Sequence, residues 1–190
     1  PPVIKPCKAK PYTQIRIVPD LERFGLRELD ATMTQIVRKR AYDLAACFGV
    51  GATVKFNGEA IACTGLEPFM QLFDSVTEYG SVHERVSDRW EIGAAMSDEG
   101  FRHVSFVNGI STLKGGKHVD YIANGIAKKV VELVKRRKKI DVRVSYVKEN
   151  LIVFVKALIS NPSFDSQTKE TLTTPVSKFG SRCEVPDRFV

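Results

Sequence analysis

The chain has 190 residues, 43% of them hydrophobic and 27% charged, with a formal net charge of +7 at neutral pH. Such a length and composition are typical of one globular domain of good size, with or without flexible extensions. No apolar run is long enough to cross a bilayer, so we expect no membrane partner. The four cysteines lack CxxC spacing, which argues against a zinc site or a disulfide framework and favours reduced thiols in an intracellular protein. The chain starts at Pro1 without an initiator methionine, which leads us to expect a piece of a longer protein.

The first part of the chain predicts a connector, a strand and a helix. Residues 1–12 are rich in proline and have no hydrophobic period, which is typical of an extended connector. Thr13–Val18 alternates polar and apolar residues, as a strand does. Asp30 can cap a helix that runs to about Phe48, where Gly49 would end it. We expect this helix to bury one apolar face, formed by Met33, Ile36, Val37, Ala41, Leu44, Ala45 and Phe48.

The middle of the chain predicts antiparallel strands followed by one long helix. Asn57-Gly58 lies between two strand-like runs and predicts a hairpin. Three further runs are expected to form an antiparallel meander: Val82–Val86, Trp90–Met96 and His103–Val107. A helix from about His118 to Lys138 carries a continuous apolar stripe, which should pack against this sheet.

The last part of the chain predicts the centre of the sheet. Leu151–Ile159 is a nearly continuous apolar run, which predicts a central strand buried on both faces. Antiparallel strands together with one long helix that crosses between two strands indicate an α+β fold, with helices on one face of the sheet. A short helix is expected after Lys169, and the chain after Pro175 is expected to be loosely ordered.

Positive charge is concentrated near the end of the predicted long helix. Lys128–Lys139 contains seven basic residues and one acid, whereas the rest of the chain is almost neutral. The basic run Lys135, Arg136, Arg137, Lys138 and Lys139 could contact a nucleic-acid backbone. A solvated helix end whose cations complement the helix dipole would explain the same run, and so would a nuclear localisation signal.

The sequence lacks the motifs of a complete active site. The three histidines are scattered, no metal-ligand spacing is present, and we expect no metal site. Gly115-Gly116, before the long helix, lacks the spacing of a P-loop. Such a pair can bind an anion at a helix N-terminus, or it can allow a tight turn and close packing, and we favour the second role.

The most informative stretch is Asn161–Thr171, which reads NPSFDSQTKET. Turn-forming residues open it, and the polar cluster Gln167-Thr168-Lys169 closes it. A strand that ends in a polar loop with one lysine can aim a compact positive charge at a phosphate. The spacing alone is also compatible with an ordinary surface lysine.

Several stretches together resemble the transducer domain of eukaryotic type IIA DNA topoisomerase. They are PDLERFGL (Pro19–Leu26), RKRAYDLA (Arg38–Ala45), DRWEIGAAMS (Asp88–Ser97), SFVNGISTLKGGKHVDYI (Ser105–Ile122) and NPSFDSQTKET (Asn161–Thr171). The likeness runs from about Gln14 to Phe189 with the family's motif order and spacing. The gyrase B subunit is similar more loosely, mainly in the FVN, GG and QTK stretches.

The resemblance implies a domain organisation and a fold. Residues 1–12 would connect to an ATP-binding domain of the GHKL class outside this chain, and residues 13–190 would form the transducer domain. The implied fold is that of the second domain of ribosomal protein S5. It has a mixed four-stranded sheet with helices on one face and a left-handed βαβ crossover, although such crossovers are generally right-handed.

The resemblance also implies residue roles. The family's QTK loop corresponds to Gln167, Thr168 and Lys169, where the lysine contacts the γ-phosphate of ATP in the neighbouring domain as a catalytic and nucleotide-binding residue and the glutamine assists. ATP and Mg²⁺ would be held mainly by that other domain, so the chain alone would bind neither and be inactive. The family's lysine-rich loop, which is implicated in sensing DNA, falls around Lys135–Lys139. This chain has KRRKK where relatives often interrupt the lysines with Asn and Gly.

The implied function is the transducer part of an ATP-dependent type II DNA topoisomerase, an isomerase, which couples ATP binding and hydrolysis to DNA strand passage. The implied partners are DNA, the rest of the topoisomerase chain and a second copy in a homodimer, and the implied location is the nucleus. Two alternatives stay open: a stand-alone basic nucleic-acid-binding domain, and the same fold in another GHKL ATPase, such as a mismatch-repair ATPase or a chaperone.

Overall fold

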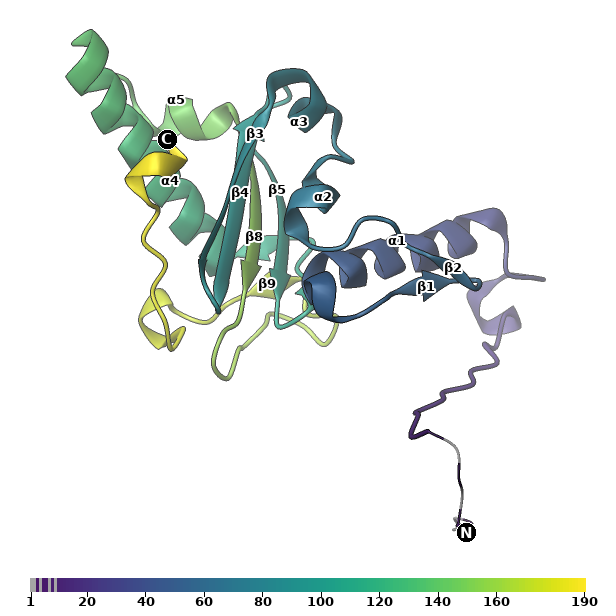
Figure 1. Ribbon diagram of the computed structural model, residues 1–190. Coiled ribbons are helices and arrows are strands. Elements are labelled where there is room, and N and C mark those ends of the chain that lie inside the picture. The colour runs from purple at the N-terminus through teal and green to yellow at the C-terminus, as the bar shows by residue number, and fades with distance from the viewer. Residues whose placement is uncertain (1–2, 4, 7, 9) are drawn as a thin grey trace. The chain divides into compact units, whose positions relative to one another are not determined.

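A computed structural model describes residue 3, residues 5–6, residue 8 and residues 10–190 (Figure 1). The chain forms two compact units, Pro1–Ile36 and Val37–Val190. The helices are α1 (Ala31–Phe48), α2 (Leu66–Met70), α3 (Asp74–Tyr79), α4 (Lys117–Lys138) and α5 (Val144–Glu149), with 3-10 turns η1 (Glu22–Phe24), η2 (Gly49–Gly51), η3 (Val176–Lys178) and η4 (Asp187–Phe189). The strands are β1 (Lys55–Phe56), β2 (Glu59–Ala60), β3 (Ser81–Ser87), β4 (Trp90–Met96), β5 (Arg102–Val107), β6 (Ile110–Ser111), β7 (Gly115–Gly116), β8 (Leu151–Ala157) and β9 (Thr171–Leu172).

The described residues of the first unit contain the 3-10 turn η1 and the start of α1, and the rest of them form no helix or strand. Thr13–Val18 is exposed and forms no strand, so that prediction is wrong. An alternating pattern needs a neighbouring strand to pair with, and the described residues of this unit provide none. The predicted helix cap is confirmed, because Asp30 Oδ1 accepts the N–H of Met33 at 2.8 Å.

The second unit is built on a five-stranded mixed sheet with the order β3-β4-β8-β5-β6. Strand β8 is central: it runs antiparallel to β4 and parallel to β5. The prediction of a buried central strand is therefore confirmed. The predicted meander is wrong at its second step, because β8 separates β4 from β5. The most apolar strand takes the position with two neighbours and two covered faces, and the strands' own periodicity does not reveal this pairing.

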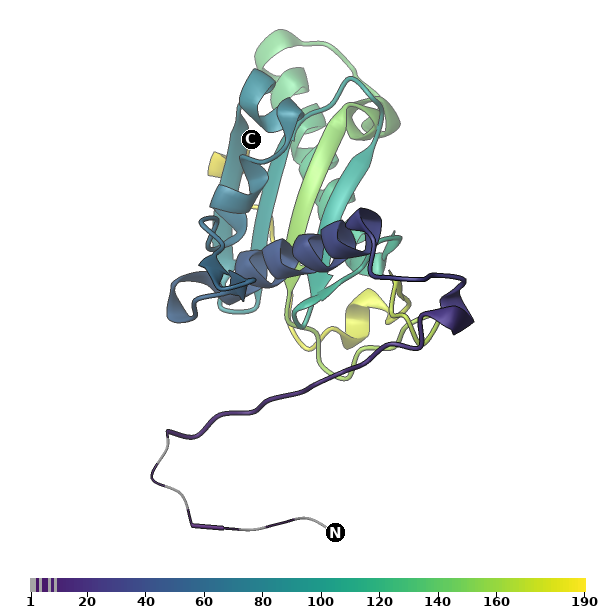
Figure 2. The same ribbon diagram turned by 90° about the vertical axis from the view of Figure 1, so that its right-hand side faces the viewer.

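Helices cover both faces of this sheet, so the expectation of helices on one face is wrong. Figures 1 and 2 show α4 on one side of the sheet and α2 with α3 on the other. Strand β8 serves both cores by alternation: Val153 and Val155 belong to one buried cluster, and Ile152 and Phe154 belong to the other. The expected four strands are joined by a fifth, the two-residue β6.

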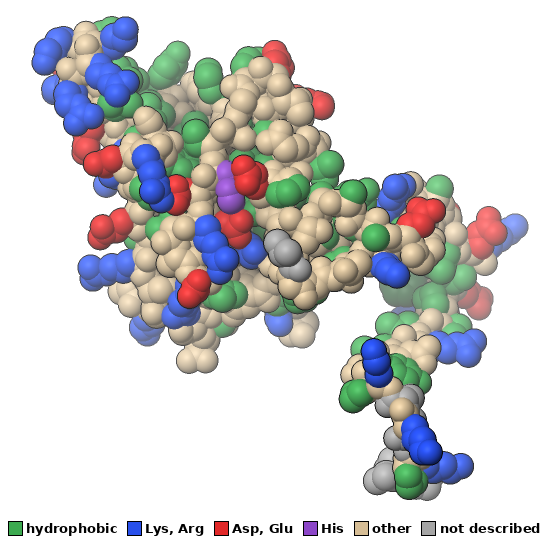
Figure 3. Space-filling model, in the orientation of Figure 1, with side chains coloured by type: hydrophobic (Ala, Val, Ile, Leu, Met, Phe, Trp, Pro, Cys, Tyr) green, Lys and Arg blue, Asp and Glu red, His purple; other side chains and the backbone are tan. Residues whose placement is uncertain are grey.

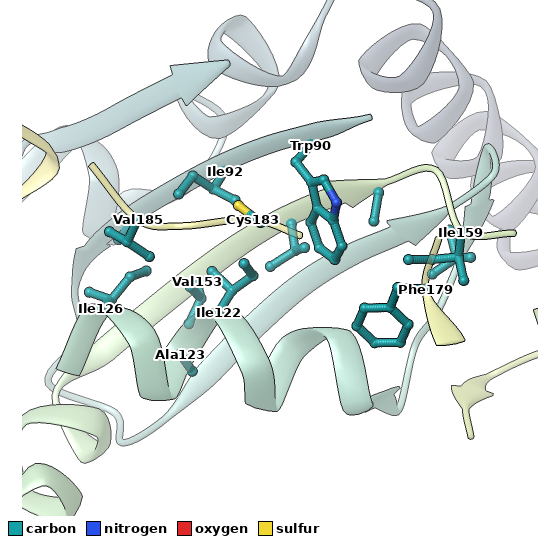
Figure 4. Packing of buried hydrophobic residues seen from close by; sticks show 14 of the residues in the cluster. Trp90, Ile92, Ile122, Ala123, Ile126, Val153, Ile159, Phe179, Cys183 and Val185 are labelled. Atoms are coloured by element: carbon teal, nitrogen blue, oxygen red, sulfur yellow. The ribbon is translucent and has the colours of Figure 1, made fainter. Parts of the chain in front are cut away.

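The core on the α4 side unites the sheet, the helix and the C-terminal segment (Figure 4). Ile122 and Ile126 of α4 pack in the same cluster as Ile92 and Val153, which confirms the predicted apolar stripe in the first part of the helix. Trp90 lies 6.0 Å from Tyr121 and 5.8 Å from Phe179, measured between ring centroids.

The chain after Pro175 is ordered, contrary to expectation, because it contributes to this core. Its buried side chains are Phe179, Cys183, Val185 and Phe189. Arg89 holds the segment in place by donating to the carbonyls of Leu158, at 3.0 Å, and Gly180, at 2.9 Å. The described cysteines, Cys47, Cys63 and Cys183, are free thiols, and Cys7 lies outside the described residues. No helix in the described part of the chain is long and apolar enough to cross a membrane.

The core on the opposite face contains a close contact between a glycine of the sheet and a side chain of α2. Gly93 makes room for Met70 of α2, since a Cβ at Gly93 would lie 2.4 Å from the Met70 sulfur. Helix α1 joins this core through Ala45 and Ala46, whereas Val37 and Phe48 are more than half exposed. The predicted apolar face of α1 is therefore confirmed only at its small residues Ala41 and Ala45, which are buried, and is wrong at its large aliphatic and aromatic residues.

The start of α4 is fixed by a two-residue parallel pairing between β7 and β9. Gly116 has a φ of 125°, and a Cβ there would lie 2.3 Å from the Leu172 carbonyl oxygen. This geometry supports the packing role of the glycine pair that we favoured. Helix α4 lies in the connection between the parallel strands β5 and β8, as the βαβ prediction requires, and its left-handed sense stays a prediction. The domain boundary after residue 12 also stays a prediction.

A buried polar chain lies beside this pairing. Thr112 Oγ1 lies 2.6 Å from Ser105 Oγ and 3.1 Å from His118 Nε2. Burial is the largest cause that lowers the pKa of His118, to about 3, so the imidazole is neutral at physiological pH. Its Nδ1 has no hydrogen-bond partner among the described residues.

Replacing Gly116 with alanine should lower the free energy of unfolding by about 3 kcal/mol or more, because the added Cβ strikes the Leu172 backbone. Urea unfolding of this chain measures the change. Gly109→Ala is the matched control: φ is +79° there, but a Cβ would meet nothing within 4 Å, so only about 1–2 kcal/mol of backbone strain is expected. Equal losses in the two variants would contradict the steric explanation.

Acidification should destabilise the fold through His118. The unfolded imidazole takes up a proton near pH 6.5, whereas the folded one does so only near pH 3. Stability is therefore lost as the pH falls below about 6.5, by up to about 1.4 kcal/mol for each pH unit. His103, whose pKa burial also lowers, contributes in the same direction. In urea titrations between pH 7 and 5, His118→Gln should flatten this dependence, and an unchanged slope would contradict it.

Candidate functional site

The predicted phosphate-directed lysine lies in a hairpin that spans Ser163–Thr173, here called the QTK hairpin. Its stem is an antiparallel ladder in which the N–H of Thr173 donates to the Ser163 carbonyl at 2.9 Å and Phe164 pairs with Leu172. Leu172 is buried in the main core, and Phe164 packs against that core. The stem is therefore tied to the sheet and α4. The short helix expected after Lys169 is absent, since β9 occupies that position.

The tip of the hairpin is a tight turn over Ser166–Lys169. The N–H of Lys169 donates to the Ser166 carbonyl at 3.1 Å, and the hydroxyls of Ser166 and Thr168 lie 2.9 Å apart. Lys169 has a φ of 59°, a left-handed conformation that side-chain-bearing residues adopt only at a cost. The surrounding hydrogen bonds are what maintain this conformation.

Lys169 and Gln167 have no bound partner within the described chain. Neither side chain makes a hydrogen bond or ion pair there; Gln167 is exposed and Lys169 partly exposed. Six other lysines in the described chain each pair with a carboxylate: Lys39, Lys114, Lys129, Lys135, Lys148 and Lys156. The Lys169 ammonium is thus available to an anion, and the neighbouring amide can donate to the same ligand.

Two contacts join the QTK hairpin to the start of α4. The N–H of Lys114 donates to the Glu170 carbonyl at 3.0 Å, and the Lys114 ammonium lies 2.6 Å from the Glu170 carboxylate. The hydrogen bond to Glu170 raises the pKa of Lys114. The β7–β9 pairing follows immediately, with Gly115 opposite Thr171. The hairpin that carries the predicted lysine is therefore held by the glycine pair that the sequence singled out and by the Lys114–Glu170 pair that it did not.

The basic run lies at the opposite end of α4. Lys135, Arg136, Arg137 and Lys138 form the last turn, and Lys139 caps it in a left-handed conformation with its N–H on the Lys135 carbonyl. All five side chains are exposed, and Lys135 pairs with Asp141 at 2.8 Å. Figure 3 shows this end of α4 as a cluster of basic side chains. Since α4 has 22 residues, about 33 Å separates its two ends.

The charged groups around one cavity of the second unit are already paired. A cavity of about 660 Å³ beside β3 and β4 is lined by His83, Glu91 and Lys156, among others. His83 Nε2 and Lys156 Nζ each lie 2.9 Å from a carboxylate oxygen of Glu91, so this cluster satisfies itself and indicates no ligand class. Within the described chain, no group of three or more His, Cys, Asp or Glu side chains could hold a metal ion.

Sequence reasoning missed three supporting features: Asp165, the Lys114–Glu170 pair and the close approach of Gly116 to Leu172. Asp165 is visible in the sequence as a turn former next to the QTK cluster, but its hydrogen bonds depend on the hairpin register. The other two features join residues that are more than fifty positions apart in the chain. No local spacing rule could have found them.

Comparisons with known proteins identify the family to which this chain belongs. The family model DNA gyrase B matches residues 61–189. DNA topoisomerase 2 of Pisum sativum is 44% identical over 197 aligned residues, which cover 100% of this chain and 14% of the relative. The chain therefore spans about one seventh of the length of the curated relatives that it matches.

Solved structures match over most of the chain. The ATPase region of Saccharomyces cerevisiae topoisomerase II superposes with a TM-score of 0.81 at 39% identity, over 90% of this chain and 44% of that chain. The ATPase and transducer domains of DNA topoisomerase II from Balamuthia mandrillaris give a TM-score of 0.81 at 41% identity, over 90% and 43%. The chain therefore belongs to the DNA gyrase B family, and its resemblance to eukaryotic DNA topoisomerase II is confirmed.

Proposed function

We propose that this chain is the transducer part of an ATP-dependent type II DNA topoisomerase, with Lys169 contacting the γ-phosphate of ATP in a neighbouring domain. The observation that carries the proposal is an ammonium without a partner in the described chain, on a hairpin whose stem is anchored in the main core beside the Lys114–Glu170 pair. An anion from outside the chain can form an ion pair with such a free cation.

A lysine that contacts only the terminal phosphate distinguishes ATP from ADP. Its differential affinity for the two nucleotide states can shift a conformational equilibrium. Moving a gate from almost fully open to almost fully closed takes about 5.5 kcal/mol, which is more than one exposed ion pair supplies. Association of two copies in a homodimer would provide the rest.

The same lysine would also assist hydrolysis. Charge spreads over the oxygens of the transferred phosphoryl group, and a preorganised cation beside them stabilises the transition state. Gln167 would donate its amide hydrogens to the same group. ATP and Mg²⁺ would be held mainly by a GHKL domain outside this chain, so the chain alone should neither hydrolyse ATP nor cleave DNA.

The basic run would bind DNA, the substrate whose strand passage the QTK hairpin would couple to ATP. Arg136, Arg137, Lys138 and Lys139 are exposed cations without ion pairs in the described chain, and they project from the far end of α4. Contacts of this kind neutralise phosphates without reading the base sequence. The proposed location is the nucleus, because the similar proteins come from eukaryotes, whose chromosomes lie there. The finer fold assignment, with a left-handed crossover as in ribosomal protein S5, belongs to the same proposal.

The exposed run also favours a second candidate, a basic nucleic-acid-binding domain without a nucleotide role. Both candidates expect the isolated chain to bind DNA, and they differ at Lys169, which would be dispensable in the longer enzyme if the second candidate held. The third candidate, a transducer of another GHKL machine, gains no support from the relatives, which are DNA topoisomerases.

In the longer enzyme, Lys169→Ala should lower ATP turnover by about a hundredfold or more, because a charge-stabilising donor is lost from the transition state. Lys169→Arg should recover little, since a planar guanidinium cannot replace a compact ammonium in a tight site. Steady-state ATPase assays measure both variants. Lys178→Ala, at an exposed lysine of η3, is the matched control and should behave as wild type. Wild-type turnover in Lys169→Ala would refute the phosphate contact.

Replacing Arg136, Arg137, Lys138 and Lys139 with glutamine should weaken DNA binding by this chain by about tenfold or more at moderate salt. The slope of log affinity against log salt should fall in magnitude by about 0.9 for each phosphate contact removed. Fluorescence anisotropy with a labelled duplex over a salt series gives the slope. The control replaces four exposed cations elsewhere, Arg16, Arg23, Arg27 and Lys55, with glutamine. If both sets of four substitutions weakened DNA binding equally, the net charge of the chain would account for binding and the basic run would not be a specific binding surface.

A further inference from the structure

We propose that Asp165 is a positioning residue for Lys169: its carboxylate closes the hairpin so that the lysine is preset before the nucleotide arrives. The inference rests on the proposed phosphate contact of Lys169. It adds a residue whose side chain does not touch the nucleotide.

Asp165 replaces a missing main-chain partner in the hairpin. The N–H of Asp165 donates to the Thr171 carbonyl at 3.2 Å. In a regular ladder the N–H of Thr171 would donate back to the main chain, but here it donates to Asp165 Oδ1 at 3.2 Å. The carboxylate therefore ends the stem and starts the turn, as aspartate side chains do in Asx turns.

The same oxygen holds the tip of the hairpin. Ser166 Oγ donates to Asp165 Oδ1 at 3.2 Å, and Thr168 Oγ1 lies 2.9 Å from Ser166 Oγ. The Ser166 carbonyl in turn accepts the N–H of Lys169 at 3.1 Å. A short chain of hydrogen bonds thus leads from the carboxylate to the residue that adopts the left-handed conformation.

The charges are arranged so that Asp165 does not neutralise Lys169. Hydrogen bonds from Thr171 are the main cause that lowers the pKa of the Asp165 carboxyl, so it is ionised at neutral pH. The carboxylate accepts hydrogen bonds from N–H and O–H groups and forms no ion pair in the described chain. Lys114 pairs with the neighbouring carboxylate, Glu170, at 2.6 Å. The ammonium of Lys169 is left free while its backbone is fixed.

A preset lysine should matter for catalysis, because displacement of a charge-stabilising group by about 1 Å can cost up to a hundredfold in rate. Two substitutions at this position offer the discriminating comparison. In Asp165→Asn the amide oxygen can still accept from Thr171 and Ser166, whereas Asp165→Ala removes the acceptor. A positioning role depends on the acceptor, and a direct electrostatic role depends on the charge.

The test uses the full-length enzyme with ATP as substrate and ADP as a competing ligand. Asp165→Ala should lower kcat about tenfold or more, Asp165→Asn should stay within about threefold of wild type, and the affinity for ADP should be unchanged because no γ-phosphate is present. Glu59→Ala, at an exposed carboxylate of the β1–β2 hairpin, is the matched control and should leave turnover unchanged.

A double variant separates positioning from damage to the fold. If Asp165 acts through Lys169, then Lys169→Ala/Asp165→Ala should hydrolyse ATP at the rate of Lys169→Ala alone. A further loss in the double variant, or equal losses in Asp165→Asn and Asp165→Ala, would overturn the inference. Wild-type turnover in Asp165→Ala beside a severe defect in Lys169→Ala would also overturn it and leave the proposed function intact. Wild-type turnover in both single variants would refute the proposed function itself.

Discussion

The approach of two backbones at the start of α4 is the constraint on which the rest of the site depends. Gly116 and Leu172 pair so closely that a Cβ on Gly116 would lie 2.3 Å from a carbonyl oxygen. This pairing brings β9 against β7 and sets the stem of the QTK hairpin beside the first turn of a 22-residue helix. The Lys114–Glu170 pair at 2.6 Å then adds a polar contact across the same junction. A side chain at position 116 would separate the hairpin from the helix.

The distribution of ion pairs distinguishes Lys169 from cations that serve the fold. Lys156 pairs with Glu91 at 2.9 Å within the sheet, and Lys148 pairs with Asp120 at 3.2 Å between α5 and α4. Lys169 combines a left-handed backbone with an ammonium that has no partner in the described chain, and Lys139 shares both features at the end of α4. Lys169 differs in its place on a hairpin whose stem is anchored in the main core, so its backbone is preorganised for an external anion.

The sequence predicted the parts of the fold that depend on local pattern and missed those that depend on pairing. The cap by Asp30, the hairpin at Asn57-Gly58, the stripe of α4 and the buried character of β8 all follow from neighbouring residues. The insertion of β8 between β4 and β5 does not, because strand order is decided by contacts across the whole second unit. The α1 face was mispredicted in part: its large apolar residues suggested a core contact, but Ala45 and Ala46 are the α1 residues that are buried in the cluster with α2 and β8. For the site, Gln167 and Lys169 were identified from motif and resemblance, whereas Asp165 depends on a hairpin register that spacing does not reveal.

The packing of α4 limits which movements of the QTK hairpin and the helix leave their contacts intact. Ile122 and Ile126 lie in the same core as Val153 and Trp90, so sliding of the helix along the sheet would disrupt that core. Moving the hairpin away from the helix would break the β7–β9 pairing and the Lys114–Glu170 pair together. Movement of the second unit as one body breaks none of these contacts. If Lys169 contacts a nucleotide as proposed, a force applied there would be transmitted to the whole unit, and the basic run would move with it because it belongs to the same helix.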